Sequence, residues 1–314
     1  METLIIAIVA LAGTVLVSML VETLRTEPVT PEKLAWAPEV PIQYLDVNGV
    51  RLRYIRTGQG PNLVLLHTLR TQLDIFQRVI PALAPRFTVH ALDYPGHGYS
   101  DIPEAIYEPD LFVRAVAGFL EQMKVEDAVL VGVSIGGVIP LLLAAQGNPR
   151  VRRIVSINPY DYARGRGMAR ASIVARVLVL CAMVPVLGET FMRLRNRMVE
   201  GLIFRGGVGD PDAFPAALLS DLYLGGNRRG HYQAFLNLLR NAWKWDAARA
   251  EYGKVRVPVL VVYGERDWST SAERDATVRA IPGARMELVA GGGHFLSVDR
   301  AAEVVRLVTG FAGY

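Results

Sequence analysis

The order of apolar and polar residues predicts strands and helices that alternate over most of the chain. Short runs rich in β-branched residues alternate with longer stretches whose apolar residues recur at helical spacing. Strands are expected at residues 42–47, 50–56, 62–67, 87–93, 129–133, 151–157, 257–263 and 285–289, and helices at residues 73–83, 111–123, 138–145 and 271–280 and at the C-terminus. This alternation favours a parallel sheet with helices on both faces. The pair Asn48 and Gly49 between the first two strands predicts a hairpin at an antiparallel edge.

The alternation breaks off between about residues 160 and 250. This stretch has a helical pattern and contains thirteen Lys and Arg against seven Asp and Glu. An insertion of this size between consecutive strands predicts a helical cap over the strand ends. Within it, residues 171–187 are almost wholly apolar, with Arg176 as their one charge. Two interpretations of that segment stay open: a helix in the core of the cap, or a surface that also contacts lipid or lines an acyl channel.

The first residues of the chain contain a long uncharged run. Residues 3–21 carry no charge and are bounded by Glu2 and Glu22. A helix needs about 20 apolar residues to cross the hydrocarbon core, so the run predicts a transmembrane anchor at residues 1–26 and a single-pass membrane location. A secretory signal peptide is disfavoured because the start is acidic and no small-residue cleavage site follows. A buried N-terminal helix is the alternative, disfavoured because the run is apolar all round.

Residues 27–41 contain four prolines, each of which resists helix formation. An extended linker is therefore expected between the predicted anchor and a domain at residues 42–314. Basic residues follow the predicted span, whereas only the amino terminus is basic before it, which favours the cytoplasmic side for that domain.

Composition narrows the class of protein. With 314 residues, 51% of them apolar, the chain has enough material for one large α/β domain with an insertion. The single cysteine, Cys181, cannot form an intramolecular disulfide. The sequence contains no Cys/His cluster at metal-ligand spacing, so no metal site is expected. The net charge of +4 comes mostly from scattered arginines without a nucleic-acid-binding motif, so nucleic acid is not an expected partner. A weak attraction to anionic lipid headgroups fits this charge better, and the oligomeric state is left open.

The apolar strand at residues 129–133 ends at a serine, Ser134, which lies between Gly132 and Gly136. A strand that turns sharply into a helix leaves no room for side chains two residues before and after the turn. The turn exposes the Ser134 hydroxyl and leaves the N–H of Ile135 at a helix N-terminus, where it can stabilise a developing oxyanion. Ser134 is therefore the candidate nucleophile, and an ordinary tight turn is the alternative.

A serine nucleophile needs a base and a carboxylate that orients the base. Asp267 and His294 follow Ser134 in the chain, and each comes just after a predicted strand. Because such loops meet at one edge of a parallel sheet, the three residues are expected to form a catalytic triad. Asp161, shortly after the strand at residues 151–157, is the alternative carboxylate.

The sequence resembles the α/β-hydrolase family from about residue 40 to residue 314. The resemblance rests on the glycines around Ser134, on residues 96–100 and 264–267, and on Gly293 followed by His294. It implies the α/β-hydrolase fold, with a mostly parallel sheet, helices on both faces and a helical cap insertion. It also implies a catalytic triad and no cofactor.

The resemblance also identifies the second oxyanion donor. The family has His-Gly at the end of the strand before the first helix, and the next residue supplies its N–H. Here that stretch is His67, Thr68 and Leu69, so Leu69 matches the donor and Thr68 takes the place of the glycine. His67 and His97 match turn positions of the family and are expected to be structural.

A serine rather than an aspartate nucleophile disfavours the dehalogenases and epoxide hydrolases of the family. The resemblance is nearest to serine esterases and lipases of the monoacylglycerol-lipase type, which implies hydrolysis of carboxylic esters through an acyl-enzyme. The predicted anchor and the apolar cap segment favour a lipid ester, such as a monoacylglycerol or lysophospholipid. C–C bond hydrolases and cofactor-free haloperoxidase-like members share these motifs. A non-catalytic binding module on the same fold is the alternative from a different class.

Overall fold

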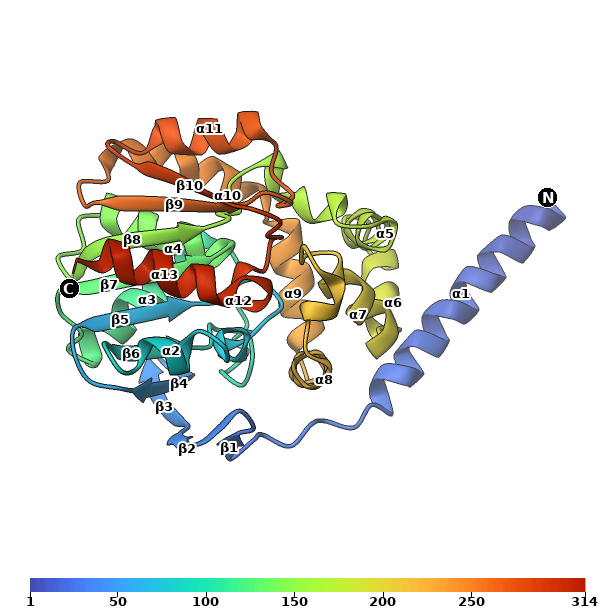
Figure 1. Ribbon diagram of the computed structural model, residues 1–314. Coiled ribbons are helices and arrows are strands. Elements are labelled where there is room, and N and C mark those ends of the chain that lie inside the picture. Colours follow the sequence, from blue (N-terminus) through green and yellow to red (C-terminus); the bar gives the residue numbers. More distant parts are fainter. Residues whose placement is uncertain (314) are drawn as a thin grey trace.

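The computed structural model describes residues 1–313, and these are built around an eight-stranded sheet with the order β10-β9-β8-β7-β5-β6-β4-β3 (Figure 1). The strands are β3 Gln43–Val47, β4 Val50–Thr57, β5 Asn62–Leu66, β6 Thr88–Leu92, β7 Ala128–Val133, β8 Val151–Ile157, β9 Val259–Gly264 and β10 Arg285–Val289. From β6 to β10 neighbouring strands are parallel, whereas β4 and β3 form an antiparallel edge. The predicted α/β-hydrolase architecture, with a mostly parallel sheet, is confirmed.

Helices cover both faces of this sheet. The α-helices of the described residues are α1 Glu2–Thr23, α2 Ile80–Leu83, α3 Pro109–Gln122, α4 Ile135–Ala145, α5 Ile173–Ala182, α6 Leu187–Arg193, α7 Arg197–Arg205, α8 Ala216–Gly225, α9 His231–Arg240, α10 Trp243–Ala247, α11 Ser271–Ala280, α12 Leu296–Asp299 and α13 Ala301–Ala312. Short 3-10 helices lie at Leu73–Phe76, Ala163–Gly165, Gly167–Arg170, Pro211–Ala213 and Ala248–Lys254. Figure 1 shows α2 and α13 on one face of the sheet and α3 and α4 on the other. All residues of β7 and β9 are buried, as expected for strands covered on both sides.

Two sequence-predicted elements illustrate how local chemistry sets the fold. The β3–β4 hairpin is confirmed: Asn48 and Gly49 both adopt positive φ, which the tight turn between right-twisted strands requires. The helix expected at residues 73–83 is instead divided between the 3-10 helix Leu73–Phe76 and α2. Pro81 lies in the first turn of α2, where its missing N–H costs no helical hydrogen bond, so a second helix begins there.

The chain between β8 and β9 forms the helices α5 to α10, of which Figure 1 shows α5 to α9 beyond the strand ends. Helix α5, in the apolar segment at residues 171–187, divides its side chains between two environments. Leu178 and Val179 are buried, whereas Ile173 and Leu180 on the same helix are exposed. This segment therefore contributes to the cap core with one face and leaves an apolar face on the surface.

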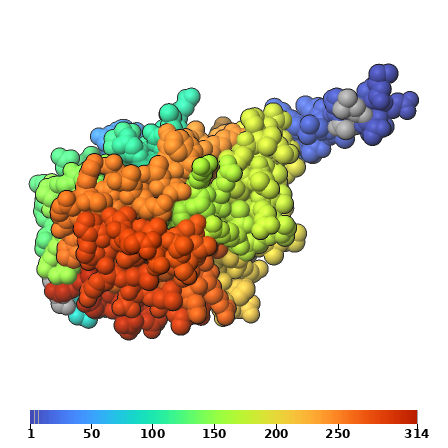
Figure 2. Space-filling model, turned by 90° about the horizontal axis from the view of Figure 1, so that it is seen from above, coloured from blue at the N-terminus to red at the C-terminus, as the bar shows by residue number. Residues whose placement is uncertain are grey.

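The N-terminal region differs from the prediction. Among residues 1–313, no helix is long and apolar enough to cross a membrane. This finding overturns the predicted transmembrane anchor at residues 1–26 and the predicted membrane location. The uncharged run does form the helix α1, which projects from the rest of the molecule (Figures 1 and 2).

The C-terminal end of α1 contacts the cap. Ser18 is fully buried, and Glu22 pairs with Arg195, whose Nη1 lies 2.7 Å from the Glu22 carboxylate. Arg25, just after the helix, donates to the carbonyl of Arg193 at 2.9 Å. These polar contacts cannot be recognised from a count of uncharged residues. The sequence analysis therefore predicted a membrane-spanning segment, although the last turns of this helix contact the cap. The following stretch, expected to be a plain linker, forms the small strand pair β1 Lys33–Leu34 and β2 Ala37–Pro41.

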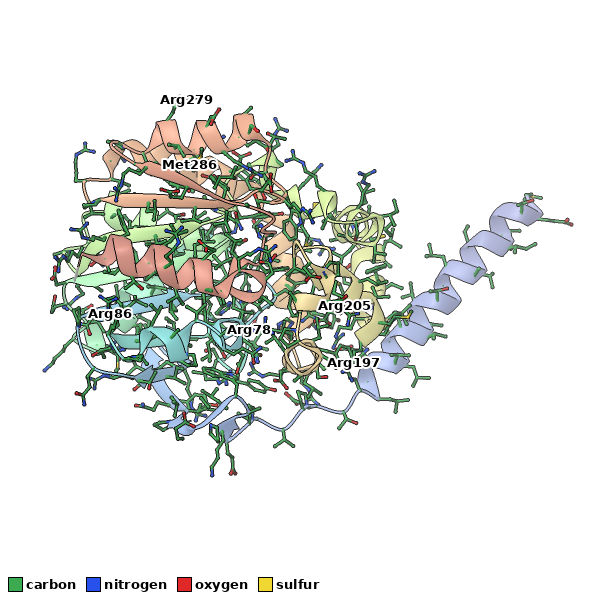
Figure 3. All side chains as sticks on the ribbon, viewed as in Figure 1. Arg78, Arg86, Arg197, Arg205, Arg279 and Met286 are labelled. Atoms are coloured by element: carbon green, nitrogen blue, oxygen red, sulfur yellow. The ribbon has the colours of Figure 1, made fainter. Side chains whose placement is uncertain are left out.

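The arginines lie on several elements. Figure 3 labels Arg279 on α11, Arg86 after α2, and Arg197 and Arg205 at the two ends of α7. Positive charge is therefore distributed over several elements of the molecule.

Candidate active site

Ser134 occupies the turn between β7 and α4 with φ 61° and ψ −120°. Its N–H donates to the carbonyl of Ile157 at 2.8 Å, which holds the turn against β8. A Cβ at Gly132 would overlap the carbonyl of Gly136, and one at Gly136 would overlap the carbonyl of Leu66. Both positions therefore require glycine, which explains the Gly-x-Ser-x-Gly pattern by close backbone approach.

The Ser134 hydroxyl is one of several buried polar groups that have no partner among the described residues. It is fully buried, and its Oγ has no hydrogen-bond partner within the described part of the chain. Buried hydroxyls in folded proteins almost always find a partner, so an unpaired one calls for an explanation. A hydroxyl that reacts with a substrate would have such an explanation, because its partner is then the bound substrate.

Asp267 and His294 lie on the loops after β9 and β10, and their side chains are hydrogen-bonded. His294 Nδ1 is 2.5 Å from Asp267 Oδ1. The other carboxylate oxygen accepts the N–H of Ser269 at 2.9 Å and also the Ser269 hydroxyl. Burial works to raise the pKa of Asp267, but His294 and Ser269 outweigh it and hold that pKa below its usual range. The carboxylate therefore stays ionised and keeps the proton of His294 on Nδ1, which leaves Nε2 free to act as a base.

The segment after β8 ties the nucleophile turn to the histidine loop. Tyr160 donates its N–H to the Ser134 carbonyl at 3.3 Å, and its ring centroid lies 6.1 Å from that of His294. The Asn158 amide donates to the carbonyls of Gly293 and His294 at 3.0 and 2.9 Å. Like Ser134 Oγ, His294 Nε2 is buried and has no hydrogen-bond partner among residues 1–313. Two unpaired groups of complementary chemistry thus belong to neighbouring loops at one edge of the sheet.

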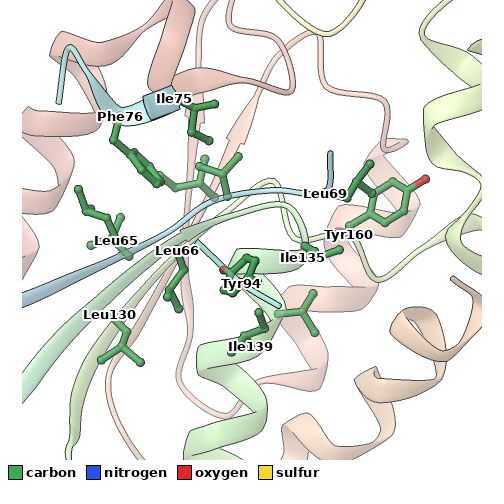
Figure 4. Packing of buried hydrophobic residues seen from close by; sticks show 14 of the residues in the cluster. Leu65, Leu66, Leu69, Ile75, Phe76, Tyr94, Leu130, Ile135, Ile139 and Tyr160 are labelled. Atoms are coloured by element: carbon green, nitrogen blue, oxygen red, sulfur yellow. The ribbon is translucent and has the colours of Figure 1, made fainter. Parts of the chain in front are cut away.

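The two predicted oxyanion donors lie at the same edge. Ile135 is the first residue of α4, so its N–H has no partner inside the helix. Leu69 follows β5, the strand that pairs with β7. Figure 4 shows Leu69, Ile135 and Tyr160 at one end of the strands, away from the core residues Leu65 and Leu130.

The loop that carries Leu69 is fixed on both sides. The carbonyl of Thr68 accepts from the N–H of Thr71 at 3.3 Å and from its hydroxyl at 2.9 Å. His67 Nδ1 lies 2.8 Å from the same carbonyl, so it carries a proton, and burial lowers the pKa of His67 to about 3. His67 is therefore a neutral hydrogen-bonding residue of the loop, as the sequence predicted for a structural role.

Arg70, next to Leu69, connects this loop to the cap. Its φ is 60°, and its Nη2 lies 2.9 Å from Oε2 of Glu200 on α7. Its Nη1 lies 2.9 Å from Nδ1 of His231, at the start of α9. The sequence analysis identified neither Glu200 nor His231. Neither lies in a local motif, because the cap brings them to Arg70 from more than a hundred residues away.

The cap also contacts the histidine loop. Gly207 accepts the N–H of Phe295 at 2.9 Å, and Gly209 accepts from Nη1 of Arg266 at 2.8 Å. The N–H of Gly209 donates to Asp299 at 2.6 Å. The cap is thus held to the loops around His294 as well as to the loop around Leu69.

A cavity of about 50 Å³ lies between the cap and these loops. Its walls are mostly apolar, and they come from the Leu69 loop, the 3-10 helix Gly167–Arg170, the helices α5, α6, α7 and α9, and the loops after β9 and β10. They include Thr68, Leu69, Arg70, Met168, Leu178, Met192, Val199, Glu200, Ile203, Phe204, Phe235, Trp268 and Phe295. A space needs roughly 10–15 Å³ to hold one water, so this cavity admits a small group next to the candidate oxyanion donor.

The alternative carboxylate, Asp161, lies in other surroundings. Both of its oxygens accept from the Thr277 hydroxyl, at 2.9 and 3.0 Å. Burial raises the pKa of Asp161 to about 7, although Thr277 and Arg249 lower it. The carboxylate that pairs with His294 in this structure is therefore Asp267.

Comparison with known proteins identifies the family to which the chain belongs. A profile of the alpha/beta hydrolase fold matches residues 61–301. A pimeloyl-[acyl-carrier protein] methyl ester esterase of Chromobacterium violaceum is 33% identical over 67% of this chain and 77% of its own. A 2-(acetamidomethylene)succinate hydrolase of Mesorhizobium japonicum is 27% identical over 85% of this chain and 93% of its own.

A solved structure, Cfl2 from Burkholderia cenocepacia, superposes with a TM-score of 0.78 at 21% identity, covering 90% of this chain and 99% of its own. The chain belongs to the α/β-hydrolase fold family, and hydrolysis is the reaction type that its relatives support.

Proposed function

We propose that this protein hydrolyses carboxylic esters through an acyl-enzyme intermediate. Ser134 Oγ attacks the ester carbonyl while His294 Nε2 takes the hydroxyl proton, and the N–H groups of Ile135 and Leu69 bind the oxyanion. His294 then returns the proton to the leaving alcohol as the C–O bond breaks. Water, deprotonated by His294, then attacks the acyl carbon. The bond to Ser134 Oγ breaks, the acid is released, and His294 returns the proton to Ser134 Oγ. Asp267 holds the imidazole and stabilises its charged form throughout.

One observation carries the proposal. Asp267 orients His294 by a 2.5 Å hydrogen bond, while His294 Nε2 and Ser134 Oγ remain buried and unpaired in the described chain. Leaving two buried polar groups unpaired costs free energy, on the order of 1–3 kcal/mol each. A binding module without chemistry gains nothing from that arrangement, whereas a hydrolase uses both groups in the reaction.

The apolar walls of the cavity favour an apolar acyl or alcohol group beside the reacting carbonyl. We extend the proposal to lipid esters of this kind, such as monoacylglycerols or lysophospholipids. The relative from Chromobacterium violaceum, which is named for hydrolysis of a methyl ester, supports ester chemistry on this scaffold.

A series of p-nitrophenyl esters of rising acyl length tests the function. We expect turnover that depends on chain length and that covalent modification of Ser134 abolishes. Hydrolysis of ketones that arise from ring fission, with no hydrolysis of esters, would favour a C–C bond hydrolase. Peracid formation without ester turnover would favour a haloperoxidase-like enzyme, and no turnover of any substrate would favour a binding module.

A further inference from the structure

Glu200 has a free oxygen beside the substrate cavity. Only 7% of the residue is exposed, and its Oε2 is engaged by Arg70 at 2.9 Å. Its Oε1 is buried and has no hydrogen-bond partner in the part of the chain that the structure describes. Such an atom is costly unless something outside the apo protein completes it.

The position of Glu200 indicates what that partner is. Glu200 lines the cavity together with Arg70, Thr68 and Leu69, and Leu69 is the proposed oxyanion donor. Phe204 and Phe235 in the wall are apolar, and the Thr68 hydroxyl, the other polar group there without a partner among the described residues, makes no hydrogen bond to Oε1. A ligand in the cavity is therefore the group best placed to donate one.

The charge of the site selects the chemical class of that group. The Arg70 guanidinium neutralises the Glu200 carboxylate across a buried ion pair, with His231 on the other side of the guanidinium. Burial raises the pKa of Glu200, and Arg70 works against that rise. An ionised carboxylate accepts hydrogen bonds only. Arg195 also acts electrostatically on Glu200, so a further cation is disfavoured by repulsion and a neutral donor fits best.

We propose that Glu200 Oε1 forms a subsite for a hydroxyl or N–H of the substrate, so that the enzyme prefers esters with a neutral hydrogen-bond donor near the scissile bond. This inference rests on the proposed ester hydrolysis and names its substrate class. A site built to bond a polar substrate group discriminates against analogues that lack it, because its own buried atom is then left unpaired.

The test compares esters with and without a hydroxyl, and on the acyl side also with a methoxy group in its place. On the acyl side these are p-nitrophenyl hexanoate, 6-hydroxyhexanoate and 6-methoxyhexanoate, with the 3-hydroxy and 3-methoxy butanoates beside butanoate. On the alcohol side they are propyl and 2,3-dihydroxypropyl butanoate. A hydrogen bond to a charged group predicts a preference in kcat/KM of about 10- to 100-fold for the hydroxyl over the methyl member of at least one set. The methoxy ester cannot donate a hydrogen bond, so its kcat/KM should equal that of the unsubstituted ester or be lower.

Two variants assign the preference to Glu200. Glu200→Met removes the acceptor at similar volume and should bring the hydroxyl-to-methyl ratio close to one. Glu200→Gln retains a carbonyl oxygen for Arg70 and turns an NH₂ toward the cavity, so it should raise the methoxy member relative to the methyl member. It also keeps the test open if the methionine variant does not fold. Glu303→Met is the matched control, because Glu303 is an exposed carboxylate paired with Arg306 on α13. Its ratios should equal those of the wild type.

The outcomes separate this inference from the proposed function. If the wild type hydrolyses no ester, the proposed function fails first. If it hydrolyses all members of each set with ratios near one, or if Glu200→Gln leaves every ratio unchanged, the Glu200 subsite is refuted while ester hydrolysis stands.

Discussion

The indole of Trp268 is stacked on the imidazole of His294, with ring centroids 3.8 Å apart and planes inclined by 12°. Trp268 directly follows Asp267, so one loop supplies both the carboxylate and the ring that contact the imidazole. The Trp268 Nε1 donates to the carbonyl of Gly206 in the cap at 3.3 Å. The stack therefore fixes the plane of the imidazole and connects it to the cap, and an indole face stabilises the charged imidazolium that the proposed mechanism requires.

Trp268→Leu should lower kcat for a short ester about 10-fold or more, because the imidazole loses its stacking partner and its stabilised charged form. Trp268→Phe, which retains an aromatic face, should recover most of that rate. Steady-state kinetics of both variants, with their unfolding transitions, check this. Equal losses in the two variants would show that volume rather than stacking matters.

Asp267→Asn should lower kcat by about 10⁴-fold, because an amide can neither hold the correct tautomer nor stabilise the imidazolium. Asp161→Asn should stay near wild-type activity at the same pH, since Asp161 bonds Thr277 and not His294. Ester kinetics of the two purified variants distinguish them. A severe loss in Asp161→Asn with activity retained in Asp267→Asn would move the acid role to Asp161.

Asp161 also predicts a pH dependence of stability. Burial raises the pKa of Asp161 to about 7, so the folded protein holds this proton more tightly than the unfolded chain does. Its contribution is full below about pH 4, the pKa of an unfolded aspartate, and is lost as the pH rises through about 7. As the pH rises through this window, the free energy of unfolding of the wild type should therefore fall relative to that of Asp161→Asn. Denaturant unfolding of both proteins measures this difference. Buried histidines such as His67 are common to both proteins and cancel. Parallel stability curves would contradict this account.

Gly209 tests the contact between the cap and the histidine loop. A Cβ there would overlap the carbonyl of Gly291, and backbone atoms cannot move aside cheaply. Gly209→Ala should lower both stability, by about 1–3 kcal/mol, and kcat, because the loop before His294 must shift. Gly253→Ala is the matched control, since a Cβ at Gly253 meets nothing within 4 Å. Thermal unfolding and ester kinetics of both variants measure the difference, and identical behaviour would argue against a tight contact.

The sheet was predictable because each strand carries its own pattern. The elements Arg285–Val289 and Ser271–Ala280 have the residues that the sequence predicted. Ser134 was recognisable because its two glycines are demanded by a local backbone approach. Asp267 and His294 were predictable as members of loops after strands, since parallel strands bring such loops to one edge.

Other features depend on contacts between distant segments. Glu200 and His231 meet Arg70 only through the packing of the cap, and Trp268 is an ordinary aromatic residue until its ring is placed over His294. The same reason explains the error at the N-terminus. A run of uncharged residues records length and hydropathy, but the ion pair of Glu22 with Arg195 is a tertiary contact.

The central claim is that Ser134 is an activated nucleophile, and covalent labelling measures this most directly. A fluorophosphonate probe should label the wild-type protein at a single site, identified as Ser134 by mass spectrometry, and should abolish ester hydrolysis in proportion. Ser134→Ala should take up no label and lose activity by a factor on the order of 10⁴ to 10⁶, while its unfolding transition remains that of the wild type. Labelling at another residue, or more than a few per cent of wild-type activity in Ser134→Ala, would contradict the account.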